Sequence, residues 1–279
     1  MDYTQIIYDV DDPVATITLN RPETLNAWTS TMDRELRSAV NEAAADRHVV
    51  GVVITGAGRG FCSGADMSLL GSVARKGSVR RSTDPWEQID GDLGGRFSWL
   101  MAIDKPVIAA INGPVAGMGL ALALCCDLRI MVPDAYITTA FARRGLIAEW
   151  GVAWLLPRLI GSATALDLLF SSRRVHGEEA QRIGLANQVV LDEELIAHCR
   201  SYIEGMAAAC SPASIAVMKA QVYSDLHRGL GAAEVASYVV MDESLKSEDF
   251  REGVAAYREG RPPKFARRDH SAAPALARP

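Results

Sequence analysis

The chain lacks the patterns by which many proteins bind metals or nucleotides or activate a serine. Its five histidines are scattered along the sequence, with no H-x-x-x-H and no Cys/His cluster, so a metal site is not indicated. No G-x-S-x-G elbow occurs. Residues 56–60 are rich in glycine, but the third glycine of a dinucleotide fingerprint would fall at Phe61, and no Gly-Lys-Ser/Thr follows. The chemistry must therefore rest on other groups.

The chain also has few cysteines and only a small net charge. The five cysteines form no C-x-x-C pair, so we expect reduced, mostly buried thiols in a cytoplasmic protein. The N-terminal MDYTQIIYDVDD has neither a basic stretch nor an apolar core, so we expect no signal peptide. A net charge of −5 argues against nucleic acid as a partner. With 279 residues and 49% hydrophobic content, the chain can bury a large core.

The one long uncharged run is residues 107–126, which reaches the length of a membrane span. It is interrupted by Asn112-Gly113-Pro114, by Gly117 and by Gly119, which do not suit a continuous apolar helix. We therefore expect no membrane span. The run instead predicts a buried strand over 107–111, a turn, and a helix over 120–126.

A second strand–turn–helix pattern lies upstream, with a strand over 49–55, a glycine turn over 56–60 and a helix entry over 62–66. Such turns bring bare backbone N–H groups to a crevice. Together with a hairpin over 6–19 and a helix from Ser30 or Thr31, with Met32, Leu36, Val40 and Ala44 on one buried face, this order predicts an α/β fold with a largely parallel sheet. Ligands then bind at the carboxyl ends of the strands.

One carboxyl stands in apolar sequence. Glu149 is the only acid between Asp134 and Asp167, and Leu146, Ile147, Trp150 and Trp154 surround it. Such a carboxyl tends to have a raised pKa and can exchange protons near neutrality. An acid at a helix start is the alternative, and the residues alone leave both interpretations open.

Two further regions are polar or helical. Residues 71–96 hold several arginines and glycines and predict a mobile or disordered loop, whose basic residues we interpret as solvated rather than phosphate-binding. Two short strands are expected at 128–132 and 136–139, and a helix at 152–159. Beyond Gly161 the chain reads as helices with short connections, which suits packing on a partner subunit, and from Arg267 it has little to pack.

Two sets of backbone donors and one apolar carboxyl suit removal of a proton next to a carbonyl group. Negative charge develops on the carbonyl oxygen, two preorganised N–H groups stabilise it, and the carboxyl carries the proton.

Five segments carry a resemblance to a known family: NRPETLNA (20–27), VVITGAGRGFCSGADMSLL (52–70), KPVIAAINGPVAGMGLALALCCDLRI (105–130), GLIAEWGVAWLLPRLIG (145–161) and RPPKF (261–265). Together they resemble the enoyl-CoA hydratase/isomerase (crotonase) superfamily over residues 5–266. The resemblance implies a crotonase-like spiral of ββα units over residues 1–200, a C-terminal helical trimerisation region over 201–266 and a flexible tail over 267–279. It also implies an acyl-CoA thioester substrate, no cofactor and no metal, and a homotrimer or dimer of trimers.

The resemblance assigns roles by position. The amides of Ala65 and Met118 would form an oxyanion hole. Further contacts to the CoA thioester are expected along the two turns and near the C-terminus, at Asn26, Ala27, Ser63, Gly64, Asp66, Met67, Gly117, Lys264 and Phe265.

The departures from the family pattern favour one reaction. Typical hydratases place two glutamates across the substrate, but this chain has Ala121 and Phe141 at those positions. Glu149 falls where peroxisomal-type Δ3,Δ2-enoyl-CoA isomerases carry their catalytic glutamate. The sequence therefore predicts an isomerase with Glu149 as proton shuttle. A hydratase or hydrolase of the same fold, and a non-catalytic acyl-CoA binder, are the alternatives.

Overall fold

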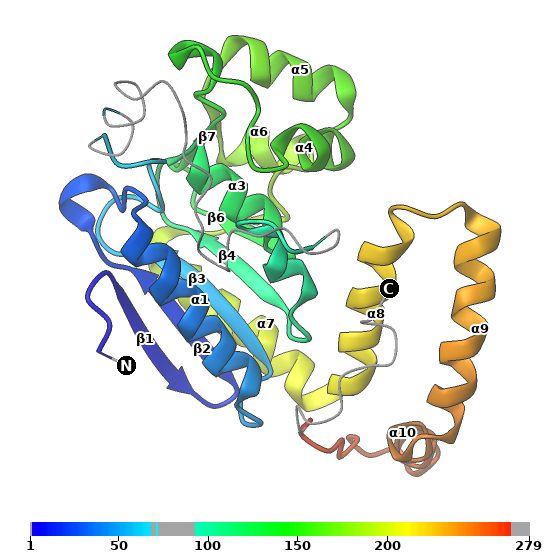
Figure 1. Ribbon diagram of the computed structural model, residues 1–279. Helices are drawn as coiled ribbons and strands as arrows, with labels where there is room; N and C mark the ends of the chain where they lie inside the picture. The colour runs from blue at the N-terminus through cyan, green and yellow to red at the C-terminus, as the bar shows by residue number, and fades with distance from the viewer. Residues whose placement is uncertain (1, 68–70, 72–92, 269–279) are drawn as a thin grey trace.

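The computed structural model describes residues 2–67, 71 and 93–268 (Figure 1). Six strands form the main sheet, in the order β1-β2-β3-β4-β6-β9. Only the β1–β2 pair is antiparallel; the other neighbours are parallel. Their bounds are β1 Ile6–Asp11, β2 Val14–Leu19, β3 Gly51–Gly56, β4 Val107–Ile111, β6 Leu128–Met131 and β9 Gln188–Val189. A smaller sheet joins β5 (Val115–Ala116), β7 (Tyr136–Thr138) and β8 (Val175–His176).

Helices cover both faces of the main sheet. The helix α1 (Ser30–Ala45) packs on β1 and β2, and α7 (Leu195–Ala209) packs on β2, β3, β4 and β6. Figure 1 shows α1 in front of the sheet and α7 behind it. The other helices are α3 Met118–Cys125, α4 Val152–Ile160, α5 Ser162–Ser171, α6 Gly177–Arg182, α8 Pro212–Asp225, α9 Leu230–Lys246 and α10 Glu248–Glu259, with short 3-10 turns at Pro22–Thr24, Ser98–Ala102, Ala142–Arg144 and Asp192–Glu194.

The core lies between these layers and explains why the strands form where they do. Every residue of β3 and β4 is buried, as expected for β-branched strands inside a parallel sheet. All eight residues of α3 are buried too. The predicted α/β fold with a parallel sheet is confirmed. The uncharged run 107–126 folds as β4, β5 and α3, and in the described part of the chain no helix is long and apolar enough to cross a membrane.

Two local predictions at α1 are wrong by one or two residues. The N-cap is Thr29, whose hydroxyl accepts a hydrogen bond from the Met32 amide at 3.1 Å, and not Ser30 or Thr31. Ala43, and not Ala44, completes the buried face with Met32, because a turn takes 3.6 residues and three steps of four residues drift off that face.

The helix α8 is tied to the sheet by a buried ion pair. Lys219 Nζ donates to Asp127 Oδ2 at 2.7 Å and to the carbonyl oxygens of Lys105 and Leu100. The Tyr223 hydroxyl donates to the other oxygen of Asp127. By contrast α9 buries none of its residues, and Figure 1 shows α9 and α10 standing away from the sheet.

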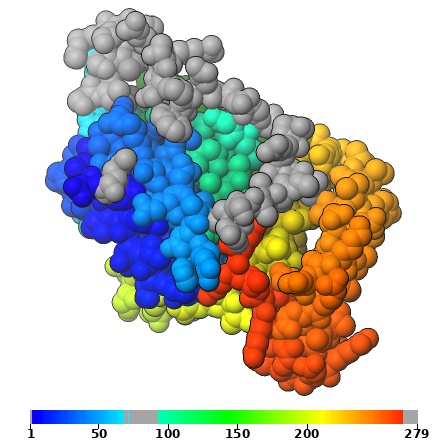
Figure 2. All heavy atoms as spheres, turned by 60° about the horizontal axis from the view of Figure 1, so that its bottom comes forward, coloured from blue at the N-terminus to red at the C-terminus, as the bar shows by residue number. Residues whose placement is uncertain are grey.

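The predicted boundaries near residues 200 and 267 fall within packed structure. The helix α7 crosses residue 200 and buries Cys199 and Ile203 against the sheet. The chain after α10 returns to the N-terminal strands (Figure 2), where Arg267 pairs with Asp12 at 3.1 Å and Arg268 with Asp104 at 3.0 Å. Arg267 and Arg268 are thus each ion-paired, and the rest of the predicted tail lies outside the described residues. So does the predicted loop 71–96, apart from Gly71 and residues 93–96.

Candidate functional site

The two glycine turns meet side by side. Cys62 and Val115 form a parallel bridge, in which the Cys62 amide donates to the Pro114 carbonyl at 3.1 Å and the Ala116 amide to the Cys62 carbonyl at 3.0 Å. A Cβ atom on Gly119 would lie 2.3 Å from the Cys62 carbonyl oxygen. Only glycine therefore lets the first turn of α3 approach the upstream turn this closely.

The Ala65 amide faces away from Trp28, the residue with which Ala65 forms an isolated β-bridge. Trp28 donates to the Gly64 carbonyl at 2.7 Å and accepts from the Asp66 amide at 3.1 Å. Because successive amides of an extended segment point in opposite directions, the N–H of Ala65 points away from Trp28.

The Met118 amide lies close to this segment. Gly64 has a φ of +102°, and a Cβ atom placed on it would lie 3.8 Å from the Met118 nitrogen. Met118 is the first residue of α3, so its N–H has no partner within the helix and sits at the positive end of the helix dipole. The structure thus brings the two predicted oxyanion-hole residues together. The helix begins two residues earlier than predicted, because Gly117, with a φ of 51°, caps it.

Two of the predicted binding residues, Asn26 and Ser63, use their side chains to hold the glycine turn together. The buried side chain of Asn26 donates to the carbonyl oxygens of Ala57 and Gly60, at 3.0 and 2.7 Å, and so closes the glycine turn. The Ser63 hydroxyl donates to the Thr24 carbonyl. These side chains build the turn, and their predicted contact with CoA through the backbone stays a prediction.

The side chain of Asp66 is bound within the protein, whereas that of Met67 is exposed. Asp66 forms an ion pair with Arg21 at 2.9 Å, and Arg21 also donates to the carbonyl of the buried residue Ala27. The Met67 side chain is 72% exposed and available to a ligand.

Glu149 lies on a tight turn before α4. The Val152 amide donates to the Glu149 carbonyl at 3.0 Å, and the two central residues, Trp150 and Gly151, have φ angles of 57° and 78°. The Glu149 side chain is half-buried. Burial raises the pKa of its carboxyl, and a hydrogen bond from the Trp150 side chain acts in the opposite direction. The expected apolar surroundings are incomplete in a single chain, since Ile147 is 79% exposed.

A chain of contacts connects this turn to the segment of the predicted oxyanion-hole residue Ala65. The Arg96 guanidinium lies 5.0 Å from the centre of the Trp150 ring. The next residue, Phe97, packs edge-to-face on Trp28 at 5.0 Å, and Trp28 pairs with Ala65. The helix α4, which follows Glu149, also packs on α3. Arg96 and Trp28 were not singled out from the sequence, which carries no local signal for contacts between segments so far apart.

The two glutamate positions of typical hydratases are apolar here. Ala121 and Phe141 are both buried, and neither side chain can accept a proton. Lys264 and Phe265 lie beside α10: the Lys264 amide donates to Glu252 at 2.6 Å, and Phe265 lies against Gly253. These contacts do not bring them to the two amides, and their role in CoA binding stays a prediction.

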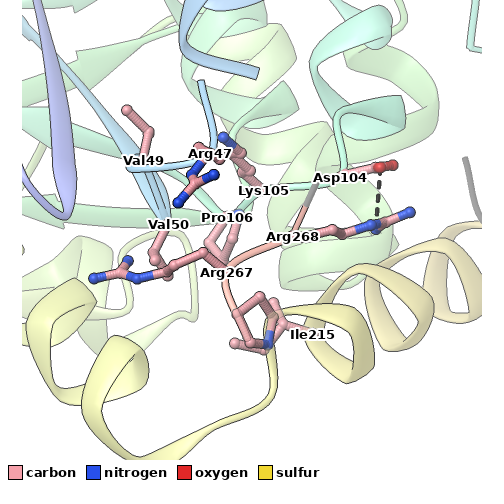
Figure 3. Close-up of a pocket in the computed structure, with 10 residues that line it drawn as sticks. Arg47, Val49, Val50, Asp104, Lys105, Pro106, Ile215, Arg267 and Arg268 are labelled. Carbon is pink, nitrogen blue, oxygen red and sulfur yellow. Dashed lines mark ion pairs between the residues drawn. The ribbon is translucent and has the colours of Figure 1, made fainter. Parts of the chain in front are cut away.

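A separate hollow lies at the opposite, amino-terminal ends of β3 and β4 (Figure 3). Arg47, Lys105, Arg267 and Arg268 line it. Lys105 Nζ donates to the Ala43 carbonyl at 2.7 Å, and Arg267 and Arg268 are ion-paired, so these three cations serve the fold. As for metals, the residues that the structure describes include no group of three or more His, Cys, Asp or Glu suited to a metal ion.

Comparison with known proteins identifies the family. Residues 9–268 match the model of the enoyl-CoA hydratase/isomerase family. The chain belongs to this family. A probable enoyl-CoA hydratase of Rhodobacter capsulatus is 37% identical over 96% of this chain and 100% of its own length. The 1,2-epoxyphenylacetyl-CoA isomerase of Escherichia coli is 33% identical over 93% of this chain and 97% of its own.

A solved structure agrees with the fold. The putative enoyl-CoA hydratase of Streptomyces coelicolor superposes with a TM-score of 0.84 at 32% identity, over 96% of each chain. Membership in the enoyl-CoA hydratase/isomerase family makes this protein an acyl-CoA enzyme with the crotonase fold, as the sequence predicted.

Proposed function

We propose that the protein isomerises the double bond of an enoyl-CoA through a thioester enolate. The Glu149 carboxylate takes a proton from C2 of a 3-enoyl-CoA, and the electron pair moves onto the thioester oxygen. The Ala65 and Met118 N–H groups hold that oxygen. The same proton returns at C4, and the double bond moves from C3–C4 to C2–C3. Each N–H donor contributes about 3 kcal/mol to the transition state in a dry site.

The observation that carries this proposal is the position of Glu149. It is a half-buried carboxyl with a raised pKa, on a turn that contacts connect to the oxyanion-hole segment. A group that both takes and returns a proton works best when its pKa is near the working pH. The buried Ala121 and Phe141 offer no second acid across the substrate.

Hydration of an enoyl-CoA is the second candidate, because several relatives are named as probable enoyl-CoA hydratases. It would require a group other than the family's two glutamates to activate water. Incubation with crotonyl-CoA separates the two reactions: a hydratase forms the 3-hydroxyacyl product, and the isomerase that we propose does not.

The Glu149→Gln variant tests the proposal. We expect turnover of a 3-enoyl-CoA to fall by about 10² to 10⁴, while binding of a CoA thioester, measured by calorimetry, persists. Glu193→Gln is the matched control, because Glu193 is exposed on the chain segment before α7. Full turnover by Glu149→Gln would end the assignment.

We further propose that the chain assembles as a homotrimer or a dimer of trimers through its C-terminal helices. Apolar side chains on α9 are exposed to an extent that is unusual for a free surface, among them Leu230 at 85%, Val235, Tyr238 and Val239. Light scattering of the purified protein tests this: the mass of three or six chains supports it, and a monomer contradicts it.

A further inference from the structure

The turn that carries Glu149 has an unusual residue at its centre. Positive φ angles at both central positions, with the Val152 amide bonded to the Glu149 carbonyl, are the features of a type I′ turn. The first central position normally holds Asn, Asp or Gly. Here it holds Trp150, a bulky residue for which the left-handed conformation is strained. Such strain persists only where the surroundings hold the residue in place.

Contacts from two other segments hold it. The Arg96 guanidinium stacks over the Trp150 ring at 5.0 Å, a geometry in which a cation is attracted to the ring face. Arg96 is itself fixed from α1: its Nη1 pairs with Asp33 at 3.4 Å, and Arg37 donates to its carbonyl oxygen at 3.2 Å. The Arg96 and Asp33 side chains are both largely buried.

Trp150 also acts on Glu149 directly. The two residues are neighbours in the same turn, and the Trp150 side chain lowers the pKa of the Glu149 carboxyl against the raising effect of burial. Fixing the ring therefore fixes the turn from which the Glu149 side chain projects. The contact chain runs from Asp33 through Arg96 and Trp150 to the carboxyl of Glu149.

We propose that Arg96 and Trp150 are positioning residues that orient the Glu149 carboxylate for proton transfer. Arg96 holds the ring, and the ring, in its strained conformation, fixes the turn from which the Glu149 carboxylate projects. Neither residue takes part in the chemistry itself. The inference rests on the proposed function of Glu149. It also explains why tryptophan occupies a turn position that a smaller residue would occupy with less backbone strain.

The test compares variants of both residues in the full chain, using kcat, KM and the pH profile for a 3-enoyl-CoA. We expect Arg96→Ala to lower kcat about tenfold with little change in KM, and Arg96→Lys to recover most of that loss, because an ammonium group can also stack on the ring. Trp150→Phe keeps a ring but loses the N–H, so the acid limb of kcat/KM should move to higher pH. Arg174→Ala is the matched control, since it removes a similar cation–π pair, with Tyr136, away from Glu149.

A glycine variant separates positioning from folding. Trp150→Gly removes the conformational strain, so we expect its melting temperature to be equal to or above that of the wild type while kcat falls. Wild-type kcat and an unmoved acid limb in Arg96→Ala and Trp150→Phe, with Glu149→Gln inactive, would overturn the inference alone. Wild-type turnover by Glu149→Gln would overturn the proposed function and the inference with it.

Discussion

The two halves of the candidate site are built in opposite ways. The half with the predicted oxyanion hole consists of backbone amides in two turns, fixed by a strand bridge and by glycines that nothing larger can replace. The other half is one side chain, Glu149, on a turn beside exposed residues, held by a stacked arginine. In the mechanism that we propose, the amides serve any thioester enolate, so the carboxyl half decides which reaction follows. Changes in the first half should therefore abolish all activity, and changes in the second should alter its kind and its pH dependence.

The largest effect is expected from crowding the backbone half. In Gly119→Ala the new methyl group would lie 2.3 Å from the Cys62 carbonyl oxygen and 2.8 Å from Cys62 Cβ. This displaces the first turn of α3 and the Met118 amide with it, so kcat should fall by about 100-fold or more. Gly205→Ala in α7 is the control: no atom lies within 4 Å of the new methyl group, and helix propensity predicts a stability gain of about 0.5–1 kcal/mol. Wild-type kcat in a folded Gly119→Ala protein would show that the amide does not contribute.

The next effect concerns the side chain that closes the glycine turn. Asn26→Ala leaves the buried carbonyl of Gly60 and the amide of Arg21 without their partner, and forces alanine into a φ of 57°. We expect a loss of about 2–4 kcal/mol in the free energy of unfolding, measured with urea. Asn41→Ala, on the exposed face of α1, should change it by less than about 0.5 kcal/mol. A raised KM with unchanged stability would instead make Asn26 a substrate contact.

The carboxyl half should govern the pH dependence. Burial raises the pKa of Glu149, and only the carboxylate can take a proton from C2. The value of kcat/KM should therefore fall as the pH drops through an apparent pKa above that of a free glutamate, and stay constant above it. An acid limb at the ordinary glutamate value would mean that the side chain is solvated in the working enzyme.

The smallest expected effect is that of Glu149→Gln on the pH dependence of the melting temperature. Because the folded-state pKa of Glu149 is raised, its contribution to stability is fully present below the unfolded pKa and is lost as the pH rises through the folded pKa. Glu149→Gln removes this titration, so its melting temperature relative to the wild type should rise slightly between acidic and neutral pH. A difference that does not change with pH would contradict the raised pKa.

The contrast between the halves also explains what the sequence could predict. Buried β-branched runs and glycine-rich turns are local signals, and they located β3, β4 and the turn over 56–60. The resemblance, not the spacing, added the roles of Ala65 and Met118.

What was missed depends on contacts between distant segments. Asn26 closes a turn 31 and 34 residues away, and Arg96 stacks on Trp150, yet neither contact follows from hydropathy or propensity. The start of α3 was placed too late, because the positive φ of Gly117 that caps it cannot be read from the residue type alone.

The most direct test is proton exchange at the substrate carbons in deuterated water. Wild-type protein incubated with a 3-enoyl-CoA should place deuterium at C2 and at C4, in amounts set by how often the Glu149 proton exchanges with solvent before it is returned. Glu149→Gln should bind the same thioester and incorporate none. Deuterium appearing at C2 at the wild-type rate in Glu149→Gln would show that another group moves the proton.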